Sequence, residues 1–360
     1  MTGGGVYPAL AVLQVLGDKA PEVLWIGNEG SMEAEILTRQ SISFATIPAA
    51  GLHGVGLFRL PGNLYQLLRG FFKARRILAD FKPDIIFYTG GFLSIPVSLA
   101  SHQIPSLVFV PDIEPGLALK LLIKHATAIA VSTKDSLAFL PSGKRAVVTG
   151  YPVRPELKSW TQNSSREKLN LSSSMPVLLV FGGSKGSQSI NRALYSILPE
   201  LLKVAQVVHI SGQINREEAQ ISIQNLPKEL LANYHGYSFL HSEMGAALAS
   251  ADLAVCRAGA STLGELPSFG LPAILVPYPH AWKYQHSNAE YLVKNNGAVI
   301  VEDSELEDKL LVTVLNLLNN QRVMKSMKEA MLSINNPNAA KNIGELIFEV
   351  GGLKGDISSW

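Results

Sequence analysis

The chain has 360 residues, a formal net charge of +2, and a composition that is 47% hydrophobic and 17% charged. This length exceeds what one hydrophobic core usually serves, so we expect two domains of roughly 150 to 180 residues. The composition excludes a disordered chain, and the small net charge gives no reason to expect a nucleic-acid partner. The single cysteine, Cys256, excludes an internal disulfide, and no signal peptide is visible, so the expected compartment is the cytoplasm.

Short apolar runs rich in β-branched residues alternate with helical stretches. The predicted strands are 23–26, 85–88, 106–110 and 128–131 in the first half, and 177–181, 207–210, 253–256 and 273–277 in the second. Strands that alternate with helices imply a parallel sheet with right-handed crossovers in each half. The expected fold is α/β, with two Rossmann-like domains that face a central cleft (the GT-B type) and bind ligands at the carboxyl ends of their strands.

The domain boundaries follow from a polar passage at 159–175, which we interpret as a linker. We expect one domain at 1–154, a second at 155–340, and a C-terminal helix and tail at 341–360. Glycine clusters at 2–5 and 181–187 open a helix in each half, but no strand precedes the first cluster. Either the natural start lies upstream or the first sheet lacks a member. We favour the upstream start, because a glycine turn with no strand before it is not held rigidly.

Two motifs near the middle of the chain suit a diphosphate. FGGSKGS places Gly182, Gly183 and Gly186 between a strand and a helix, where main-chain amides favour phosphate. A turn needed only for packing is the alternative. GYPVR ends the first half with Arg154, whose guanidinium is suited to a forked contact with a diphosphate. Taken alone, an arginine after a turn is more often a solvated surface group.

Two later runs supply groups for a nucleoside and a sugar. In CRAGASTLGEL, Glu265 lies one turn into a helix, where it is suited to accept hydrogen bonds from ribose hydroxyls or only to complement the helix dipole. PYPHAWKYQHSNAEY is dense in polar and aromatic groups, which suits a sugar site lined by His280, Tyr284, Gln285 and Asn288. No metal site is expected, because the histidines lack ligand spacing and no Asp-x-Asp triplet occurs.

Between residues 52 and 78, apolar and basic side chains are interleaved. No apolar run reaches the roughly 20 residues needed to cross a bilayer, so any membrane contact is expected to be peripheral. The pattern is typical of a segment that binds an anionic membrane surface, and an ordinary amphipathic helix with a solvated basic face is the alternative. The residues of this predicted membrane patch are Leu57, Phe58, Arg59, Arg69, Phe71, Phe72, Lys73, Arg75 and Arg76.

Taken together and in this order, the motifs resemble those of the MurG family of bacterial N-acetylglucosaminyltransferases. The family's T-G-G-H-x-x-P is similar to TGGGVYP here, its G-x-x-x-x-M-E-A to GNEGSMEA, and its G-G-Y-x-S to GGFLS. Its G-N-P-V-R is similar to GYPVR, its G-G-S-x-G to GGSKG, and its C-R-[SA]-G-A-x-T-x-x-E to CRAGASTLGE. The resemblance covers nearly the whole chain and is far more specific than a single glycine loop.

The resemblance implies an inverting, metal-independent transferase that needs no cofactor and holds UDP-N-acetylglucosamine mainly in its second domain. It places Glu265 at the ribose, the main chain of His241 at the uracil, and Gln285 at the sugar. Tyr284 stands where the family has the first of two glutamines. The donor-binding residues that the resemblance implies are Thr2, Gly3, Gly4, Arg154, Ser184, His241, Ala260, Ser261, Thr262, Leu263, Gly264, Glu265, Tyr284 and Gln285.

The chain departs from the family pattern mostly on the acceptor side. Gly5 replaces the histidine of the first glycine loop, and the family's H-E-Q-N becomes F-V-P-D at 109–112. An inverting transfer needs a base for the acceptor hydroxyl. Asp112 follows a predicted strand and is the candidate base, with Glu114 in reserve. The alternative is that Asp112 caps the next helix.

The resemblance implies transfer of N-acetylglucosamine to undecaprenyl-pyrophosphoryl-N-acetylmuramyl-pentapeptide in peptidoglycan synthesis. The expected partners are UDP-N-acetylglucosamine, a polyprenyl-pyrophosphate-linked acceptor and an anionic membrane surface, at the cytoplasmic face of the cell membrane. Two alternatives stay open. The chain transfers a UDP-sugar to another lipid acceptor, or it is a non-catalytic relative that binds a UDP-sugar.

Overall fold

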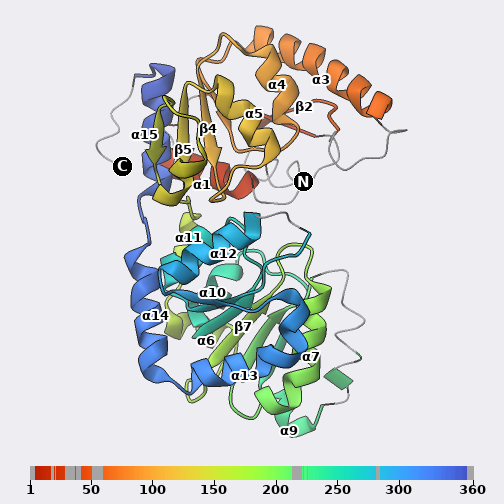
Figure 1. Ribbon diagram of the computed structural model, residues 1–360, viewed down its shortest axis with the longest axis vertical. Coiled ribbons are helices and arrows are strands. Elements are labelled where there is room, and N and C mark those ends of the chain that lie inside the picture. Colours follow the sequence, from red (N-terminus) through yellow and green to blue (C-terminus); the bar gives the residue numbers. More distant parts are fainter. Residues whose placement is uncertain are drawn as a thin grey trace. The chain divides into compact units, whose positions relative to one another are not determined.

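A computed structural model describes residues 5–17, 20, 22–28, 37, 42–50, 60–212, 221, 223–224, 226–280 and 284–354. The chain divides into two compact units. Unit 1 comprises Met1–Pro152 together with Asn338–Trp360, and unit 2 comprises Val153–Pro337. Both units are α/β, with helices packed around parallel strands (Figure 1).

Unit 2 is built on a six-stranded sheet in the order β12-β11-β10-β7-β8-β9, in which every neighbouring pair is parallel. The first strand of unit 2, β7, lies inside the sheet, as in doubly wound nucleotide-binding folds. The strands are β7 (Val177–Phe181), β8 (Gln206–Ile210), β9 (Tyr234–Tyr237), β10 (Leu253–Cys256), β11 (Ala273–Leu275) and β12 (Ala298–Ile300).

Helices connect these strands and cover the sheet. They are α6 (Gln162–Lys168), α7 (Gln188–Leu201), α9 (Lys228–Leu231), α10 (Met244–Ser250), α11 (Thr262–Phe269), α12 (Tyr284–Lys294), α13 (Leu306–Leu318) and α14 (Gln321–Ser333), with 3-10 turns η4 (Pro155–Ser159) and η6 (Asp303–Glu305). The passage 159–175, expected to be a linker, instead carries α6, which packs against α10, as does η4 directly before it. The linker interpretation is wrong because the Ser and Thr residues there cap a helix: Thr161 and Ser164 form a capping box at the start of α6.

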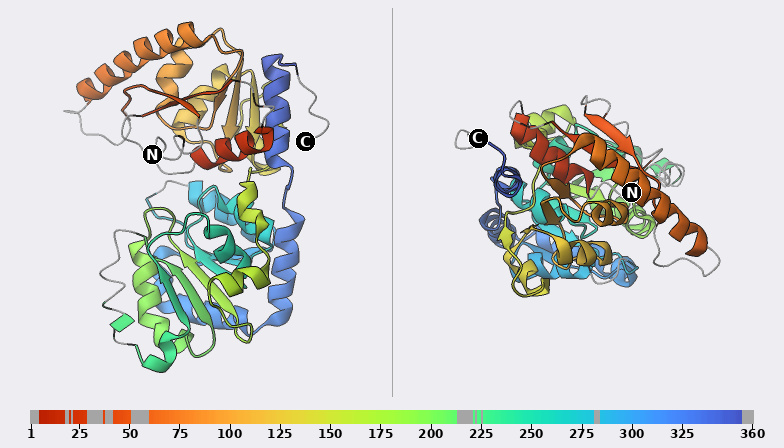
Figure 2. Two further views of the ribbon diagram at one scale, coloured as in Figure 1. Left: turned by 180° about the vertical axis from the view of Figure 1, so that it is seen from behind. Right: turned by 90° about the horizontal axis from the view of Figure 1, so that it is seen from above.

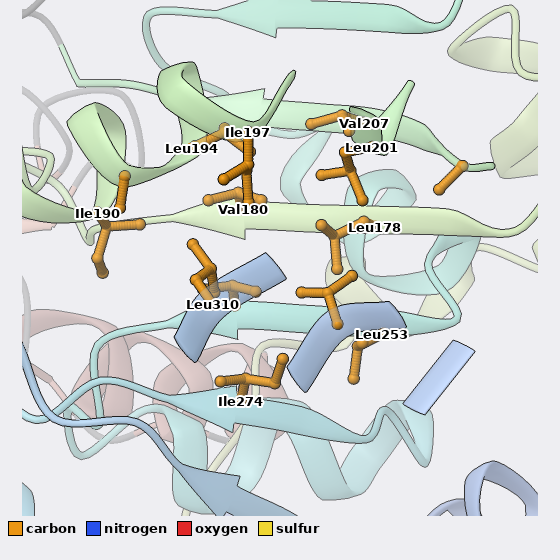
Figure 3. Packing of buried hydrophobic residues seen from close by; sticks show 14 of the residues in the cluster. Leu178, Val180, Ile190, Leu194, Ile197, Leu201, Val207, Leu253, Ile274 and Leu310 are labelled. Carbon is orange, nitrogen blue, oxygen red and sulfur yellow. The ribbon is translucent and has the colours of Figure 1, made fainter. Parts of the chain in front are cut away.

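The core of unit 2 lies between β7 and the helices that flank the sheet. Leu178 and Val180 of β7 face Leu194 and Ile197 of α7, which recur at helical spacing (Figure 3). Leu310 of α13 belongs to the same cluster. Burying a side chain of this size contributes about 1.5–3 kcal/mol, so this packing fixes the strand whose carboxyl end opens the FGGSKGS loop.

Unit 1 contains a four-stranded parallel sheet in the order β3-β4-β5-β6 and a separate parallel pair, β1-β2. The strands are β1 (Leu24–Gly27), β2 (Ser43–Thr46), β3 (Ile86–Tyr88), β4 (Ser106–Val110), β5 (Ala128–Val131) and β6 (Ala146–Val148). The helices are α1 (Val6–Leu16), α3 (Leu60–Phe81), α4 (Ser94–Ala100), α5 (Leu117–His125) and α15 (Ala339–Gly351), with the 3-10 turn η3 (Lys134–Phe139).

The last helix, α15, belongs to unit 1 although it is last in the sequence. It packs against α1 and β4 (Figure 2, left). Asn342 Nδ2 donates to the Thr149 carbonyl oxygen at 3.1 Å, and Arg145 pairs with Glu349 at 2.6 Å. In the described part of the chain, no helix is long and apolar enough to cross a membrane.

Candidate functional site

The loops that follow the strands of unit 2 meet at the carboxyl edge of its sheet. Arg257, the residue directly after β10, joins several of them. Its Nη2 donates at 2.7 Å to the hydroxyls of Ser187 and Ser189 at the start of α7. Its Nη1 pairs with Asp303 after β12 and donates to the carbonyl oxygens of residues 276 and 277 after β11. The guanidinium also lies 5.2 Å from the Tyr278 ring centroid.

This guanidinium is nearly enclosed, with its side chain 10% exposed, and every group around it is an acceptor, a carboxylate or an aromatic face. A planar group with five N–H donors can hold several loops at once, which a lysine cannot. Arg257 therefore sets the positions of the turns after β7, β10, β11 and β12. Sequence reasoning missed this role, although Arg257 belongs to the CRAGASTLGE motif.

The FGGSKGS loop requires glycine at two positions for steric reasons. A Cβ atom on Gly182 would collide with the Ser187 amide nitrogen, and one on Gly186 would collide with the Ser211 carbonyl oxygen. Gly186 also has a φ of +78°, where side chains are strained. The backbone after β7 thus packs directly on the loop after β8, while Ser184 projects as an exposed residue from the turn.

Arg154 and Glu265 are 111 positions apart in the sequence, but they lie close enough for their charges to attract. Burial raises the pKa of the Glu265 carboxyl above its ordinary value of 4.5, while the Arg154 guanidinium and a hydrogen bond from Ser261 act in the opposite direction. The Arg154 side chain is 17% exposed and pairs with Glu156 at 3.3 Å. The two predicted donor-binding residues are therefore brought together in unit 2.

The other residues of the 260–265 loop form the first turn of α11. Its amides are used within the turn: Thr262 donates to Gly259 and Gly264 to Ser261, at 3.0 and 3.1 Å. Thr262, Leu263 and Gly264 are buried, whereas Ala260, Ser261 and Glu265 are partly exposed. The exposed members of this loop are the ones able to touch a ligand.

The start of α12 supplies Tyr284 and Gln285, both partly exposed. Gln285 Oε1 accepts from the Tyr278 amide at 2.9 Å. The Nε2 end of its side-chain amide therefore faces away from this contact. Asn288 is fully buried and donates to the Ala258 carbonyl oxygen at 3.0 Å. It therefore holds α12 against the loop after β10, and the expectation that it lines a sugar site is wrong.

His241 lies in the loop between β9 and α10, where it is exposed and 4.6 Å from the Phe239 ring, centroid to centroid. Its carbonyl oxygen accepts from the Met244 amide at 3.5 Å. Helix α10 begins at Met244, three residues after His241. Figure 1 shows α10, α11 and α12 in the same region of unit 2.

In unit 1, Asp112 and Glu114 follow β4 and are partly exposed. Helix α5 begins at Leu117, five residues after Asp112, and its N-cap residue is Gly116. Glu114 pairs with Lys120 at 2.8 Å. A Cβ atom on Gly5 would lie 3.3 Å from both the carbonyl oxygen and the hydroxyl of Thr89, so this position has little room for a side chain.

The predicted membrane patch falls partly on α3, a helix of 22 residues. Its buried side carries Gly70, Ala74 and Leu78, and the opposite side carries a second apolar stripe. This stripe, 52–65% exposed, consists of Leu64, Tyr65, Leu68 and Phe72. Of these four residues, only Phe72 belongs to the predicted membrane patch. Phe71 of that patch is half-buried, with its ring centroid 5.3 Å from that of Phe72.

Basic side chains surround the exposed stripe of α3. Arg69 lies over the Tyr65 ring at 5.8 Å, Lys73 donates to Thr46 at 3.3 Å, and Arg76 lies 4.0 Å from Asp80. Arg75 is exposed. Six predicted residues lie outside the described part of the chain: Thr2, Gly3, Gly4, Leu57, Phe58 and Arg59.

Comparison with known proteins agrees with this architecture. Residues 2–131 match the glycosyltransferase family 28 N-terminal domain, and residues 177–343 match its C-terminal domain. The chain therefore belongs to glycosyltransferase family 28, whose members have the two-domain GT-B fold.

Within that family the chain is a homologue of MurG. A UDP-N-acetylglucosamine--N-acetylmuramyl-(pentapeptide) pyrophosphoryl-undecaprenol N-acetylglucosamine transferase from Roseiflexus sp. is 36% identical, over 96% of this chain and 92% of the relative. The protein of the same name from Desulforamulus reducens is 32% identical, over 97% and 96%. The crystal structure of Acinetobacter baumannii MurG superposes with a TM-score of 0.75 and 27% identity, over 96% of both chains.

We predict that replacing Arg257 destabilises unit 2 strongly. Arg257→Met leaves Asp303 partly buried without its cation, and such a loss costs about 3 kcal/mol. Arg322→Met is the control, because Arg322 is an exposed arginine on α14 of the same unit, and it should have a small effect. Urea unfolding measures both variants. A cost for Arg257→Met no larger than that of an exposed substitution would contradict the role given to Arg257.

We predict that Glu265 makes stability depend on pH. Because the pKa of Glu265 is raised in the folded state, its carboxyl ionises first in the unfolded chain as the pH rises through 4.5. The free energy of unfolding therefore falls with rising pH until the pH exceeds the pKa of the folded state. Glu265→Gln removes this fall and is more stable than the parent at neutral pH. Denaturation curves at several pH values measure it, with exposed Glu229→Gln as control. Parallel curves for parent and Glu265→Gln would rule the effect out.

Proposed function

We propose that the chain transfers N-acetylglucosamine from UDP-N-acetylglucosamine to undecaprenyl-pyrophosphoryl-N-acetylmuramyl-pentapeptide, the step that completes the lipid-linked disaccharide of peptidoglycan. The observation that carries the proposal is the grouping of Arg154, Glu265 and the glycine loop within one unit. Relatives whose names state this reaction match over at least 96% of the chain, which supports the same donor and acceptor.

The donor is proposed to lie at the carboxyl edge of the unit 2 sheet. Arg154 and the amides near Ser184 neutralise the diphosphate, with α7 starting directly after this loop. Glu265 accepts from the ribose hydroxyls. The main chain at His241 contacts the uracil, and the first turn of α11, residues 260–264, encloses the nucleotide.

Gln285 is proposed to contact the sugar. Its Oε1 already accepts from the Tyr278 amide, so its Nε2 hydrogens are the part directed to a sugar hydroxyl. Tyr284, beside it, presents a phenol where the family has an amide. Charge on the leaving diphosphate is balanced by protein groups, and we propose that sugar transfer needs no metal ion.

The chemistry is a single displacement with inversion. A base removes the proton of the acceptor hydroxyl as its oxygen bonds to the anomeric carbon of the donor sugar. The bond from that carbon to the diphosphate oxygen breaks, and UDP leaves with the electron pair. We assign the base to Asp112. Glu114 is the reserve, but its pairing with Lys120 makes it the weaker candidate.

A second candidate changes only the acceptor. Gly5 has no side chain and little room for one beside Thr89. The chain therefore has no counterpart of the family's histidine side chain at this position. This favours a different lipid acceptor under the same donor. A non-catalytic UDP-sugar-binding protein is the third possibility.

One assay separates the three. UDP release is measured with a short-chain muramyl pyrophosphate lipid, with diacylglycerol and with no acceptor. We expect release with the muramyl lipid alone. It should be abolished in Arg154→Ala and retained in Arg145→Ala, whose arginine is a half-exposed surface cation. Release only with diacylglycerol supports the second candidate, and no release with any acceptor overturns both enzyme assignments.

We predict that Asp112→Asn lowers turnover about a hundredfold or more, because a base contributes about that much to such a transfer, while UDP binding is unchanged. Glu114→Gln is the matched control and should have a small effect. Steady-state kinetics and UDP titration provide the two measurements. Turnover within about twofold of the parent means that Asp112 is not the base.

We also propose that the protein binds the cytoplasmic face of the cell membrane through α3. Its exposed apolar stripe is flanked by Arg69, Lys73, Arg75 and Arg76, a combination that suits acyl chains beneath anionic headgroups. Lys73 and the arginines supply the charge, and Phe72 is the most exposed apolar side chain of the stripe.

Vesicle sedimentation tests this proposal. Replacing Arg69, Arg75 and Arg76 by Gln should weaken binding to anionic vesicles about a hundredfold, at about 1 kcal/mol for each charge, and salt should weaken binding by the parent. The control replaces Arg322, Lys325 and Lys328, exposed on α14 of unit 2, and should have no effect. Equal binding to neutral vesicles would contradict the electrostatic part.

A further inference from the structure

The proposed chemistry does not use a buried histidine of unit 2, His209, which lies in β8 and is fully enclosed. Its Nδ1 lies 2.8 Å from the Tyr234 hydroxyl in β9, and its Nε2 lies 3.0 Å from Asn191 Oδ1 in α7. Asn191 Nδ2 in turn donates to the Ser211 carbonyl oxygen at 2.8 Å. These groups form one chain of hydrogen bonds, which we call the His209 relay.

One arrangement of protons satisfies every member of the His209 relay. If the Asn191 amide were turned round, its oxygen would face the Ser211 carbonyl oxygen, and two acceptors would meet. Asn191 Oδ1 therefore faces His209, so His209 Nε2 carries the hydrogen. Burial lowers the pKa of the imidazole to about 3 and raises the pKa of the Tyr234 phenol. The ring is therefore neutral, and its Nδ1 accepts from the Tyr234 hydroxyl.

The His209 relay ends against the FGGSKGS loop. The Ser211 carbonyl oxygen that accepts from Asn191 is the atom with which a Cβ on Gly186 would collide. A Cβ atom on Gly212 would lie 2.7 Å from the Gly186 amide nitrogen. The two stretches of backbone are packed with no side chain between them, so a shift of the Ser211 carbonyl moves the loop.

The FGGSKGS loop is thus held from two sides. Arg257, after β10, binds the hydroxyl of Ser187, which caps α7 and directly follows Gly186. The His209 relay acts from the other side, because β8 and β10 lie on opposite sides of β7 in the sheet. A fully satisfied buried network specifies one geometry, since loss of any link leaves a polar group buried without a partner.

We propose that His209 is a positioning residue for the donor diphosphate: through Asn191 it fixes the Ser211 carbonyl against Gly186, and thereby the main-chain amides of the FGGSKGS loop. His209 is buried and does not itself contact the substrate. The inference rests on the proposed function, because it takes the UDP diphosphate to be bound at this loop. The role depends on the Nε2–H tautomer of the ring and involves no proton transfer.

A matched pair of substitutions tests the His209 relay. In His209→Gln the side-chain amide supplies a donor and an acceptor, as the neutral imidazole does, whereas His209→Leu supplies neither. We expect His209→Leu to weaken UDP binding about tenfold or more, and His209→Gln to stay within about threefold of the parent. Calorimetric titration with UDP measures the affinity, and circular dichroism shows whether each variant is folded. The control, Ser196→Ala, removes a hydroxyl of α7 outside the relay and should bind UDP as the parent does.

Uridine separates a positioning role from a general loss of structure, because it lacks the phosphates. His209→Leu should bind uridine within about threefold of the parent. Equal weakening of uridine and UDP, or a UDP affinity within about threefold of the parent, would overturn the proposal. If His209→Leu does not fold, Tyr234→Phe takes its place with the same expected results, since it lacks only the hydroxyl that donates to the ring. A parent chain that does not bind UDP overturns the proposed donor site, and the positioning role with it.

Nitrogen NMR of the imidazole gives a second test that involves no ligand. In the parent, His209 Nε2 should carry hydrogen and Nδ1 should not, and neither signal should change between about pH 5 and 8, where an exposed histidine titrates. The signals are assigned by their loss in His209→Gln. Hydrogen on Nδ1, or titration within that range, overturns the relay whether or not the chain binds UDP.

Discussion

The arrangement of unit 2 depends on the Arg257 guanidinium, which is nearly enclosed and bound to groups from three other loops. The carboxyl ends of the parallel strands bring several loops and helix starts together at one edge of the sheet. Arg257 satisfies the Ser187 and Ser189 hydroxyls, Asp303 and two main-chain carbonyls together. Because these partners follow different strands, several of the loops that surround the donor in our proposal are bound to the same side chain. Glu265 lies on α11, which begins five residues after Arg257.

The central strands were predictable because burial on both faces makes them continuous apolar runs. β4, β5, β7 and β10 have the predicted bounds, and β1, β3, β8 and β11 differ by one or two residues. The strands that no prediction covered are β2, β6, β9 and β12, each at the edge of its sheet. These strands have only three or four residues, and β2 (SFAT) and β9 (YHGY) are partly polar. Such short runs show no clear periodicity, so pairing with a neighbouring strand decides their structure.

The candidate site was predictable where a residue's chemistry is visible in its own motif. Arg154 and Glu265 stand in such motifs, and the structure brings them together. The role of Arg257 and the buried position of Asn288 depend on partners far away in the sequence, which local spacing cannot reveal. On α3, basic residues were identified from composition, but the exposed apolar stripe required knowing that Gly70 and Ala74 occupy the core side. A Cβ atom on Gly70 would collide with the Pro48 carbonyl oxygen, which fixes that face.

The position of α15 has a consequence for synthesis of the chain on the ribosome. Residues Val153–Pro337 of unit 2 are contiguous, so its sheet can close as soon as they emerge. Unit 1 is begun first but completed after unit 2, because α15, which covers α1 and β4, is translated after the residues of unit 2. Until then the apolar surface of α1 stays open to water or to a chaperone. The order of completion is therefore the reverse of the order of translation.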